Sequence, residues 1–163
     1  MTDINLKKKL NDAEAMVLVE LLFFAYRDFV ADPDHMLEGL GFGRAHHRIL
    51  HFVGRDPGMT VARLLDILKI TKQSLARVLK ELIDKDYVFQ KEGAVDRRQR
   101  LLHLTPKGEA LRQALAAPQI ARFKRAAAET GSDGYHDLLL HLINPENQGS
   151  ASHWVQRLVL KNE

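Results

Sequence analysis

The segment YVFQKEGAVDRRQRLLHLTPKG, residues 87–108, decides the fold of this chain. Apolar and polar residues alternate over 87–91 and again over 100–104, which is typical of two short strands. The loop between them begins at Gly93 and carries a run of charge, Asp96 followed by Arg97, Arg98 and Arg100. The segment therefore predicts a β-hairpin with a positively charged tip.

Two short helices are expected immediately before the hairpin. Thr60 can cap a helix over 61–69, and after a tight turn Thr71 can cap a second helix over 72–85. The second helix has a buried stripe spaced three and four residues apart, made of Leu75, Val78, Leu79, Leu82 and Ile83. Asp86 follows its last turn, where a left-handed backbone is common. A helix-turn-helix followed at once by a basic hairpin predicts a winged helix.

The N-terminal part predicts a scaffold of helices. Residues 12–31 form a helix that is apolar on most sides, through Val17, Leu18, Leu21, Leu22, Phe24, Ala25 and Phe29. Part of this surface is expected to be covered by a second subunit. The sequence Asp32-Pro33-Asp34 is expected to end or restart the helix, with Asp32 as the cap and Pro33 at the first helical position. A glycine-rich joint at 39–43 leads to a helix over 44–53.

The C-terminal part predicts further helices. Thr105 and Pro106 start a long helix that ends at Gly131, and a shorter helix follows with Tyr135, Leu138, Leu139 and Leu142 on one side. The tail, residues 144–163, is expected to contain a short docking helix with Trp154, Val155, Leu158 and Val159 on one face. The expected fold class is mainly α with a small β-hairpin wing: a winged helix-turn-helix flanked by N- and C-terminal dimerisation helices.

Length and composition favour one domain over residues 1–163. It divides into N-terminal scaffold helices (12–54), a winged helix-turn-helix (60–104), and C-terminal dimerisation helices with the tail (105–163). No apolar run approaches the roughly 20 residues of a membrane helix, so no membrane partner is expected. The chain has no cysteine, which excludes disulfides and a thiol-based peroxide sensor. A cytoplasmic location is expected.

Positive charge is concentrated in the middle of the chain. Residues 60–107 contain eleven Lys and Arg against six Asp and Glu, whereas residues 1–59 contain seven against nine and residues 108–163 six against six. A cationic centre on a near-neutral scaffold favours contact with a polyanion such as nucleic acid.

The sequence resembles the MarR family of bacterial transcription regulators. The resemblance is carried by DRRQRLLHLTPKG, in which Asp96, Arg98, Leu104, Thr105 and Gly108 match the family's wing and exit pattern, and it extends over roughly residues 12–143. Two features depart from the family: Asp86 stands where glycine is usual, and the tail beyond Asn144 is additional. The resemblance implies a homodimer that binds double-stranded DNA at a pseudo-palindromic site.

The expected DNA-binding residues lie on the second helix of the pair and on the wing. The first turns of such a helix enter the major groove, and a hairpin carrying arginine reaches the minor groove. The candidates are Thr71, Lys72, Gln73, Ser74, Arg77, Lys80, Arg97, Arg98 and Arg100. Asp96 would repel phosphate, so its expected role is structural, accepting a charge-assisted hydrogen bond from Arg97 or Arg98. The alternative is that the helix face and the hairpin are charged only for solubility.

Family resemblance also implies a small aromatic or phenolic effector. Its pocket could be lined by Tyr26, Phe29, Met36, Phe42 and His46, although ordinary core packing explains these residues as well. His47 and His51, four apart on one helix, are weak candidates for a metal site because no acidic or cysteine partners lie at ligand spacing nearby. No cofactor is expected.

Three other functions fit the sequence less well. No phosphate-binding glycine loop or catalytic triad is suggested, so no enzyme activity is expected. A winged helix used for protein contact, with its basic face against an acidic partner, is the stronger alternative. A metal-responsive regulator is the weaker one, since it depends on the histidines alone.

Overall fold

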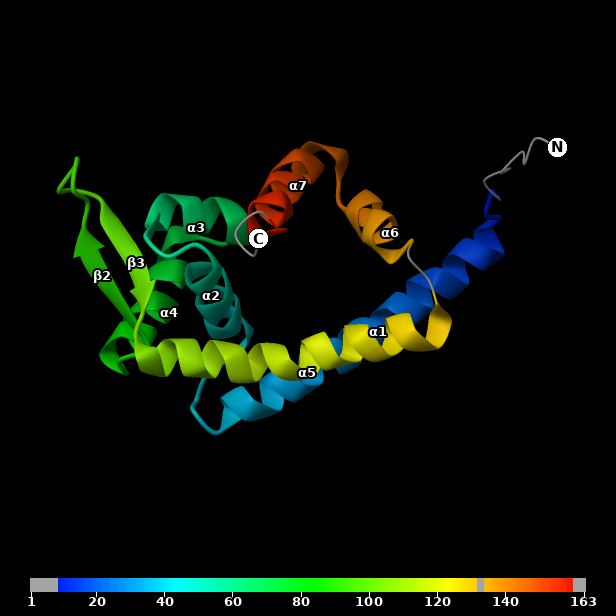
Figure 1. Ribbon diagram of the computed structural model, residues 1–163, viewed down its shortest axis with the longest axis horizontal. Coiled ribbons are helices and arrows are strands. Elements are labelled where there is room, and N and C mark those ends of the chain that lie inside the picture. Colours follow the sequence, from blue (N-terminus) through cyan, green and yellow to red (C-terminus); the bar gives the residue numbers. More distant parts are fainter. Residues whose placement is uncertain (1–8, 132–133, 160–163) are drawn as a thin grey trace.

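The computed structural model describes residues 9–131 and 134–159, and it is mainly helical with one small antiparallel sheet. Two long helices lie side by side and carry a winged helix at one end, while the C-terminal helices fold back toward that end (Figure 1). The expected fold class, mainly α with a small β-hairpin wing, is therefore confirmed. Within the described residues, no helix combines the length and the apolar character needed to cross a bilayer.

The winged helix is built on helices α2 (Arg44–Arg55), α3 (Val61–Leu68) and α4 (Lys72–Asp84). Their inward side chains are completely or almost completely buried, and they form one core with the sheet: Ile49, Leu50, Val53, Leu64, Leu75, Val78, Leu82 and Leu102. The hydroxyls of Thr60 and Thr71 cap α3 and α4, as predicted. Asp86 has a left-handed backbone (φ 62°), which confirms the expectation for the turn after α4.

The wing consists of strands β2 (Val88–Glu92) and β3 (Arg100–Leu104), close to the predicted bounds. A third strand, β1 (Met59–Thr60), was not predicted; it pairs with the other edge of β3, Met59 opposite Leu102. Two residues are too few to show the alternation that reveals a strand in sequence. β1 fixes the base of the wing against the start of α3.

Helix α1 (Asp12–Glu38) packs along α5 (Pro106–Thr130). The prediction that the helix ends or restarts at Asp32-Pro33 is wrong, because α1 continues through Pro33. Proline lacks an N–H and so leaves the carbonyl four residues earlier without its helical partner. That carbonyl, of Phe29, instead accepts a hydrogen bond from Nε2 of Gln119 on α5, at 3.3 Å. Pro33 itself is buried, and the Gln119 contact thus helps α1 to continue without interruption.

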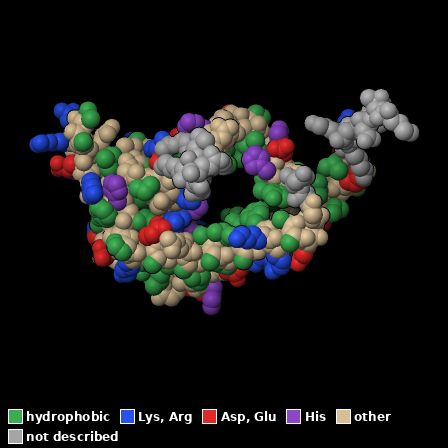
Figure 2. All heavy atoms as spheres, viewed as in Figure 1, with side chains coloured by type: hydrophobic (Ala, Val, Ile, Leu, Met, Phe, Trp, Pro, Cys, Tyr) green, Lys and Arg blue, Asp and Glu red, His purple; other side chains and the backbone are tan. Residues whose placement is uncertain are grey.

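Helices α6 (Tyr135–Leu142) and α7 (Pro145–Val159) bring the chain back from the far end of α5 to the winged helix. The space-filling view shows an opening between these helices and the α1–α5 pair (Figure 2). The tail helix is longer than predicted, because it begins at Pro145.

The far half of α1 leaves much apolar surface uncovered. Nine large apolar side chains of this helix are between 45% and 70% exposed: Met16, Val17, Leu18, Val19, Leu21, Leu22, Phe23, Phe24 and Tyr26. Ile120 and Phe123 of α5 and Leu138, Leu139 and Leu142 of α6 are exposed in the same way. A contiguous apolar surface of this kind marks an interaction site.

Candidate nucleic-acid interface

Helix α4 presents a polar face opposite its buried stripe. Lys72, Gln73, Ser74, Arg77 and Lys80 are all exposed. The Thr71 hydroxyl accepts the Ser74 backbone N–H at 3.1 Å and donates to Ser74 Oγ at 2.9 Å. Thr71 is therefore occupied by capping, while the Ser74 hydroxyl donates no hydrogen bond among the described residues and can donate to a phosphate.

Two cations of α4 are already paired along the helix. Arg77 Nη1 donates to Glu81 Oε1 at 2.8 Å, and Lys80 pairs with Asp84. Both pairs have the i, i+4 spacing and remain largely exposed, so each contributes little to stability in water. Lys72 has no ion-pair partner among the described residues.

The wing loop is held by its own backbone. The Gly93 N–H donates to the Gln99 carbonyl at 3.0 Å, and the Gln99 N–H donates to the Asp96 carbonyl at 3.1 Å. A Cβ on Gly93 would lie 2.5 Å from the Asp96 carbonyl oxygen, so this close turn requires glycine. The loop is thus compact and shaped independently of any ligand.

Asp96 has a structural role, but its partner differs from the predicted one. Its Oδ1 accepts the backbone N–H of Arg98 at 2.9 Å, rather than a guanidinium. An aspartate that accepts the N–H two residues ahead closes an Asx turn. The guanidinium groups of Arg97 and Arg98 therefore stay free, with no ion-pair partner among the described residues.

Arg100 lies at the base of the loop and is paired across the hairpin. Glu92 is directly opposite it in the register, and Arg100 Nη1 donates to Glu92 Oε1 at 3.0 Å. A cross-strand pair of opposite charge stabilises the hairpin. Arg100 thus already has a structural partner, in contrast to the two tip arginines.

The wing and α4 lie at the same end of the molecule. In the space-filling view, Lys and Arg side chains gather at the tip of the wing (Figure 2). A groove runs between α3, α4 and β2, and it is lined by Lys72 and Lys80 from α4 and by Gln90 from β2. The lysines of the helix therefore border the strand that leads to the wing tip.

The five residues suggested for an effector pocket do not share one cavity among those described. Tyr26 and Phe29 line a cavity of about 370 Å³ between α1, α5 and α6, with Phe123 and Leu139. Phe42 and His46 are buried and stack on each other at 4.5 Å between ring centroids. Met36 is 40% exposed. An effector stays a prediction, and Phe42 and His46 belong to the core.

The weak metal candidates His47 and His51 lie on α2. Burial, with the nearby His47, Arg112 and Arg55, lowers the pKa of His51 to about 4. Burial also lowers the pKa of His47. Among the described residues, no group of three or more His, Cys, Asp or Glu side chains is placed to hold a metal ion.

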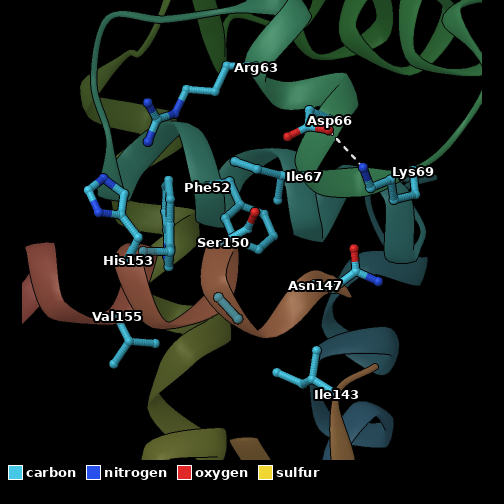
Figure 3. A pocket seen from close by; sticks show the side chains of 12 residues that line it. Phe52, Arg63, Asp66, Ile67, Lys69, Ile143, Asn147, Ser150, His153 and Val155 are labelled. Atoms are coloured by element: carbon cyan, nitrogen blue, oxygen red, sulfur yellow. Dashed lines mark hydrogen bonds and ion pairs between the residues drawn. The ribbon is translucent and has the colours of Figure 1, made fainter. Parts of the chain in front are cut away.

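The tail contains a docking helix, as expected, and this helix packs on the winged helix. The Trp154 ring packs edge-on against Phe52 of α2 at 5.2 Å, and the Arg63 guanidinium of α3 lies 5.7 Å from its centre. Beside this contact, a cavity of about 560 Å³ separates α7 from α3. Ser150 and Asn147 point from α7 toward the ion pair between Asp66 of α3 and Lys69, the residue that follows α3 (Figure 3). Helix α7 of the additional tail thus contacts both α2 and α3 of the winged helix.

A capped helix pair, a basic hairpin wing and long flanking helices define this chain as a winged helix-turn-helix protein. Residues 40–99 match the MarR family. The chain is 44% identical over 139 residues to the HTH-type transcriptional regulator PetP of Rhodobacter capsulatus, and the match covers 83% of this chain and 84% of that protein. The chain therefore belongs to the MarR family of transcription regulators, which confirms the resemblance seen in the sequence.

Solved structures share the fold. A Listeria monocytogenes protein assigned to the MarR family, complexed with 26mer DNA, has a TM-score of 0.63 and 19% identity, and the match covers 84% of this chain and 91% of that one. FabT of Streptococcus pneumoniae, in complex with DNA, has a TM-score of 0.58 and 20% identity, with 90% and 95% covered.

Proposed function

We propose that this transcription regulator acts as a homodimer that reads double-stranded DNA, with α4 in the major groove and the wing in the minor groove. One observation carries the proposal. Helix α4, whose polar face is exposed, lies at the same end of the molecule as the β2–β3 loop. That loop carries Arg97 and Arg98, which have no ion-pair partner among the described residues. The DNA-bound state of two proteins with the same fold supports the proposal.

Each side chain of α4 suits a particular contact. Gln73 can pair with adenine, and Arg77 or Lys80 with guanine, through the major-groove edges of the bases. Lys72, near the helix start, is suited to a phosphate, which the N-terminus of α4 also attracts.

The wing supplies contacts of a different kind. Arg97 and Arg98 are suited to a narrow minor groove, where the negative potential is strongest. Val95, which the sequence reasoning did not single out, is completely exposed at the tip. An apolar side chain at such a tip can contact deoxyribose or wedge between base steps.

The uncovered apolar surface of α1, α5 and α6 is the proposed dimer interface. A second copy would bury it and would place a second α4 about one turn of DNA from the first, so the site should be pseudo-palindromic. We place this activity in the cytoplasm, and it requires binding alone, without catalysis or a cofactor.

Fluorescence anisotropy on duplexes from the region upstream of the chain's own gene tests the proposal. Wild-type protein should bind one duplex specifically, and log affinity should fall with log salt by about 0.9 for each phosphate contacted. Arg98→Ala should weaken this binding on the order of tenfold. Arg125→Ala on α5, which also removes an exposed arginine, should leave it unchanged.

Two results would count against DNA reading. An affinity independent of salt would exclude phosphate contacts. Binding that Arg98→Ala leaves intact, in a folded dimer, would favour the alternative in which the basic face meets an acidic protein.

A further inference from the structure

A buried histidine of α2 lies behind the exposed arginine of α4, and one glutamate joins them. Nε2 of His46 lies 2.7 Å from Oε2 of Glu81, and the other oxygen, Oε1, accepts a hydrogen bond from Arg77 at 2.8 Å. His46 and Glu81 are 35 positions apart in the sequence, so only the fold brings them together.

His46 is fixed in one orientation. It is 6% exposed, and its ring stacks on Phe42. Its Nδ1 accepts the backbone N–H of Gly43, just before α2, at 3.1 Å. An imidazole that accepts at Nδ1 carries its hydrogen on Nε2, so His46 donates to Glu81.

Glu81 in turn has both oxygens assigned to different donors. The hydrogen bond from His46 is the largest contribution lowering the pKa of this carboxyl below its ordinary value, and Arg77 acts in the same direction. Because His46 holds the Glu81 carboxylate, the guanidinium of Arg77 has one defined position. A free arginine side chain samples many conformations.

The neighbouring pair on the same helix shows the difference. Lys80 and Asp84 have the same i, i+4 spacing, but among the described residues Asp84 accepts no hydrogen bond from behind. Of these two carboxylates on α4, Glu81 is therefore the one that is hydrogen-bonded to a buried side chain.

We propose that Glu81, held by His46, is a positioning residue that fixes the Arg77 guanidinium for reading one base. The inference rests on the proposed DNA-binding function and deepens it. Arg77 uses Nη1 on Glu81, which leaves its other N–H groups for the major groove. The guanidinium is already oriented before the duplex binds, because Glu81 holds it. We therefore expect this hydrogen bond to increase discrimination between DNA sequences more than it increases overall affinity.

The test compares two substitutions that each remove one carboxylate charge from α4. Affinity is measured for a duplex that the wild-type chain selects from a random pool and for a scrambled duplex. Glutamine has a single acceptor oxygen and cannot serve both His46 and Arg77, so Glu81→Gln should lower the ratio of the two affinities on the order of tenfold. Asp84→Asn should raise both affinities together and leave the ratio within about twofold, as expected for lost repulsion of phosphate.

Two further variants separate positioning from folding. His46→Phe retains an aromatic ring against Phe42 but removes the donor, and it should lower the ratio as Glu81→Gln does. His46→Gln, whose amide supplies one acceptor and one donor group, should restore part of the affinity ratio that His46→Phe loses. In an Arg77→Ala background, Glu81→Gln should have no further effect on the ratio, because the two residues act as one unit. Thermal unfolding is recorded for each variant, and the Glu81 comparison stands even if His46→Phe is unstable.

The outcomes are distinct. If the wild-type chain discriminates and Glu81→Gln behaves like Asp84→Asn, Glu81 is only a surface charge and the inference is wrong, while the proposed function stands. If the wild-type chain binds both duplexes equally, the proposed function and the inference fail together.

Discussion

Gly108 occupies a position that excludes any larger residue. It lies in the first turn of α5, and a Cβ there would be 2.0 Å from the Tyr87 carbonyl oxygen. The Gly108 N–H donates to the Thr105 hydroxyl, which itself donates to the Asp86 carbonyl. The first turn of α5 therefore packs directly against the backbone that leads into β2.

Replacing this glycine should destabilise the fold. Because the neighbouring atom belongs to the backbone and cannot rotate away, Gly108→Ala should lower the free energy of unfolding by about 1–3 kcal/mol, as overpacking does. Gly149→Ala in α7, where a Cβ meets nothing within 4 Å, is the matched control and should not destabilise. Equal melting temperatures for the two variants would show that the approach at Gly108 is not tight.

His51 should make stability depend on pH. Its pKa is about 4 in the folded chain against about 6.5 unfolded, so the unfolded state binds its proton first. The contribution of the neutral His51 to the free energy of unfolding is therefore fully present above about pH 6.5. It is lost as the pH falls toward 4, by about 1–3 kcal/mol. Chemical denaturation between pH 4 and 8 should show this loss, and His51→Leu should reduce it. A slope unchanged in His51→Leu would mean that His51 is accessible to water.

At the residue scale, contacts between residues close in sequence can be predicted, and contacts between distant residues cannot. The exposed cations of α4 follow from helical periodicity, and Glu81 and Asp84 lie only four residues beyond their partners. The His46–Glu81 contact spans 35 positions, and nothing local in the sequence indicates it. From the sequence alone, His46 fits either an effector pocket or the core, and the fold places it in the core.

At the scale of elements, the wing depends on one aspartate side chain. Since Asp96 accepts a backbone N–H, its oxygen matters more than its charge. Asp96→Asn retains an acceptor and should keep DNA affinity within about threefold, whereas Asp96→Ala should weaken it on the order of tenfold by releasing the loop. Anisotropy titrations measure both. Equal losses in the two variants would mean that the negative charge itself is required.

The elements show where local sequence signals are sufficient. Threonine caps and three-four spacing predicted α3 and α4, because those signals are intrinsic to a helix. Proline is also a local signal, but at Pro33 a hydrogen bond from Gln119 on another helix replaces the lost one. Tertiary structure therefore decided the length of α1. β1 could not be predicted from local sequence either, because its two residues form a strand by pairing with β3.

At the scale of the whole molecule, the apolar surface of α1 should hold two subunits together. Leu21 and Phe24 are 56% and 58% exposed, and a second copy would bury them. The double substitution Leu21→Glu with Phe24→Glu should yield a monomer whose DNA affinity falls about a hundredfold, because two linked half-sites bind far more tightly than one.

Sedimentation and anisotropy measure the two effects. Ala110→Glu, an exposed position on α5, is the charge control and should remain dimeric. A double variant that stays dimeric would assign the interface to another surface.

Hydroxyl-radical and methylation footprinting of the wild-type dimer on its selected duplex tests the central claim most directly. Two protected major-groove segments should lie about one helical turn apart, each flanked by minor-groove protection that disappears in Arg97→Ala with Arg98→Ala. A single protected segment, or flanks that persist without these arginines, would contradict a dimer that reads DNA through α4 and the wing.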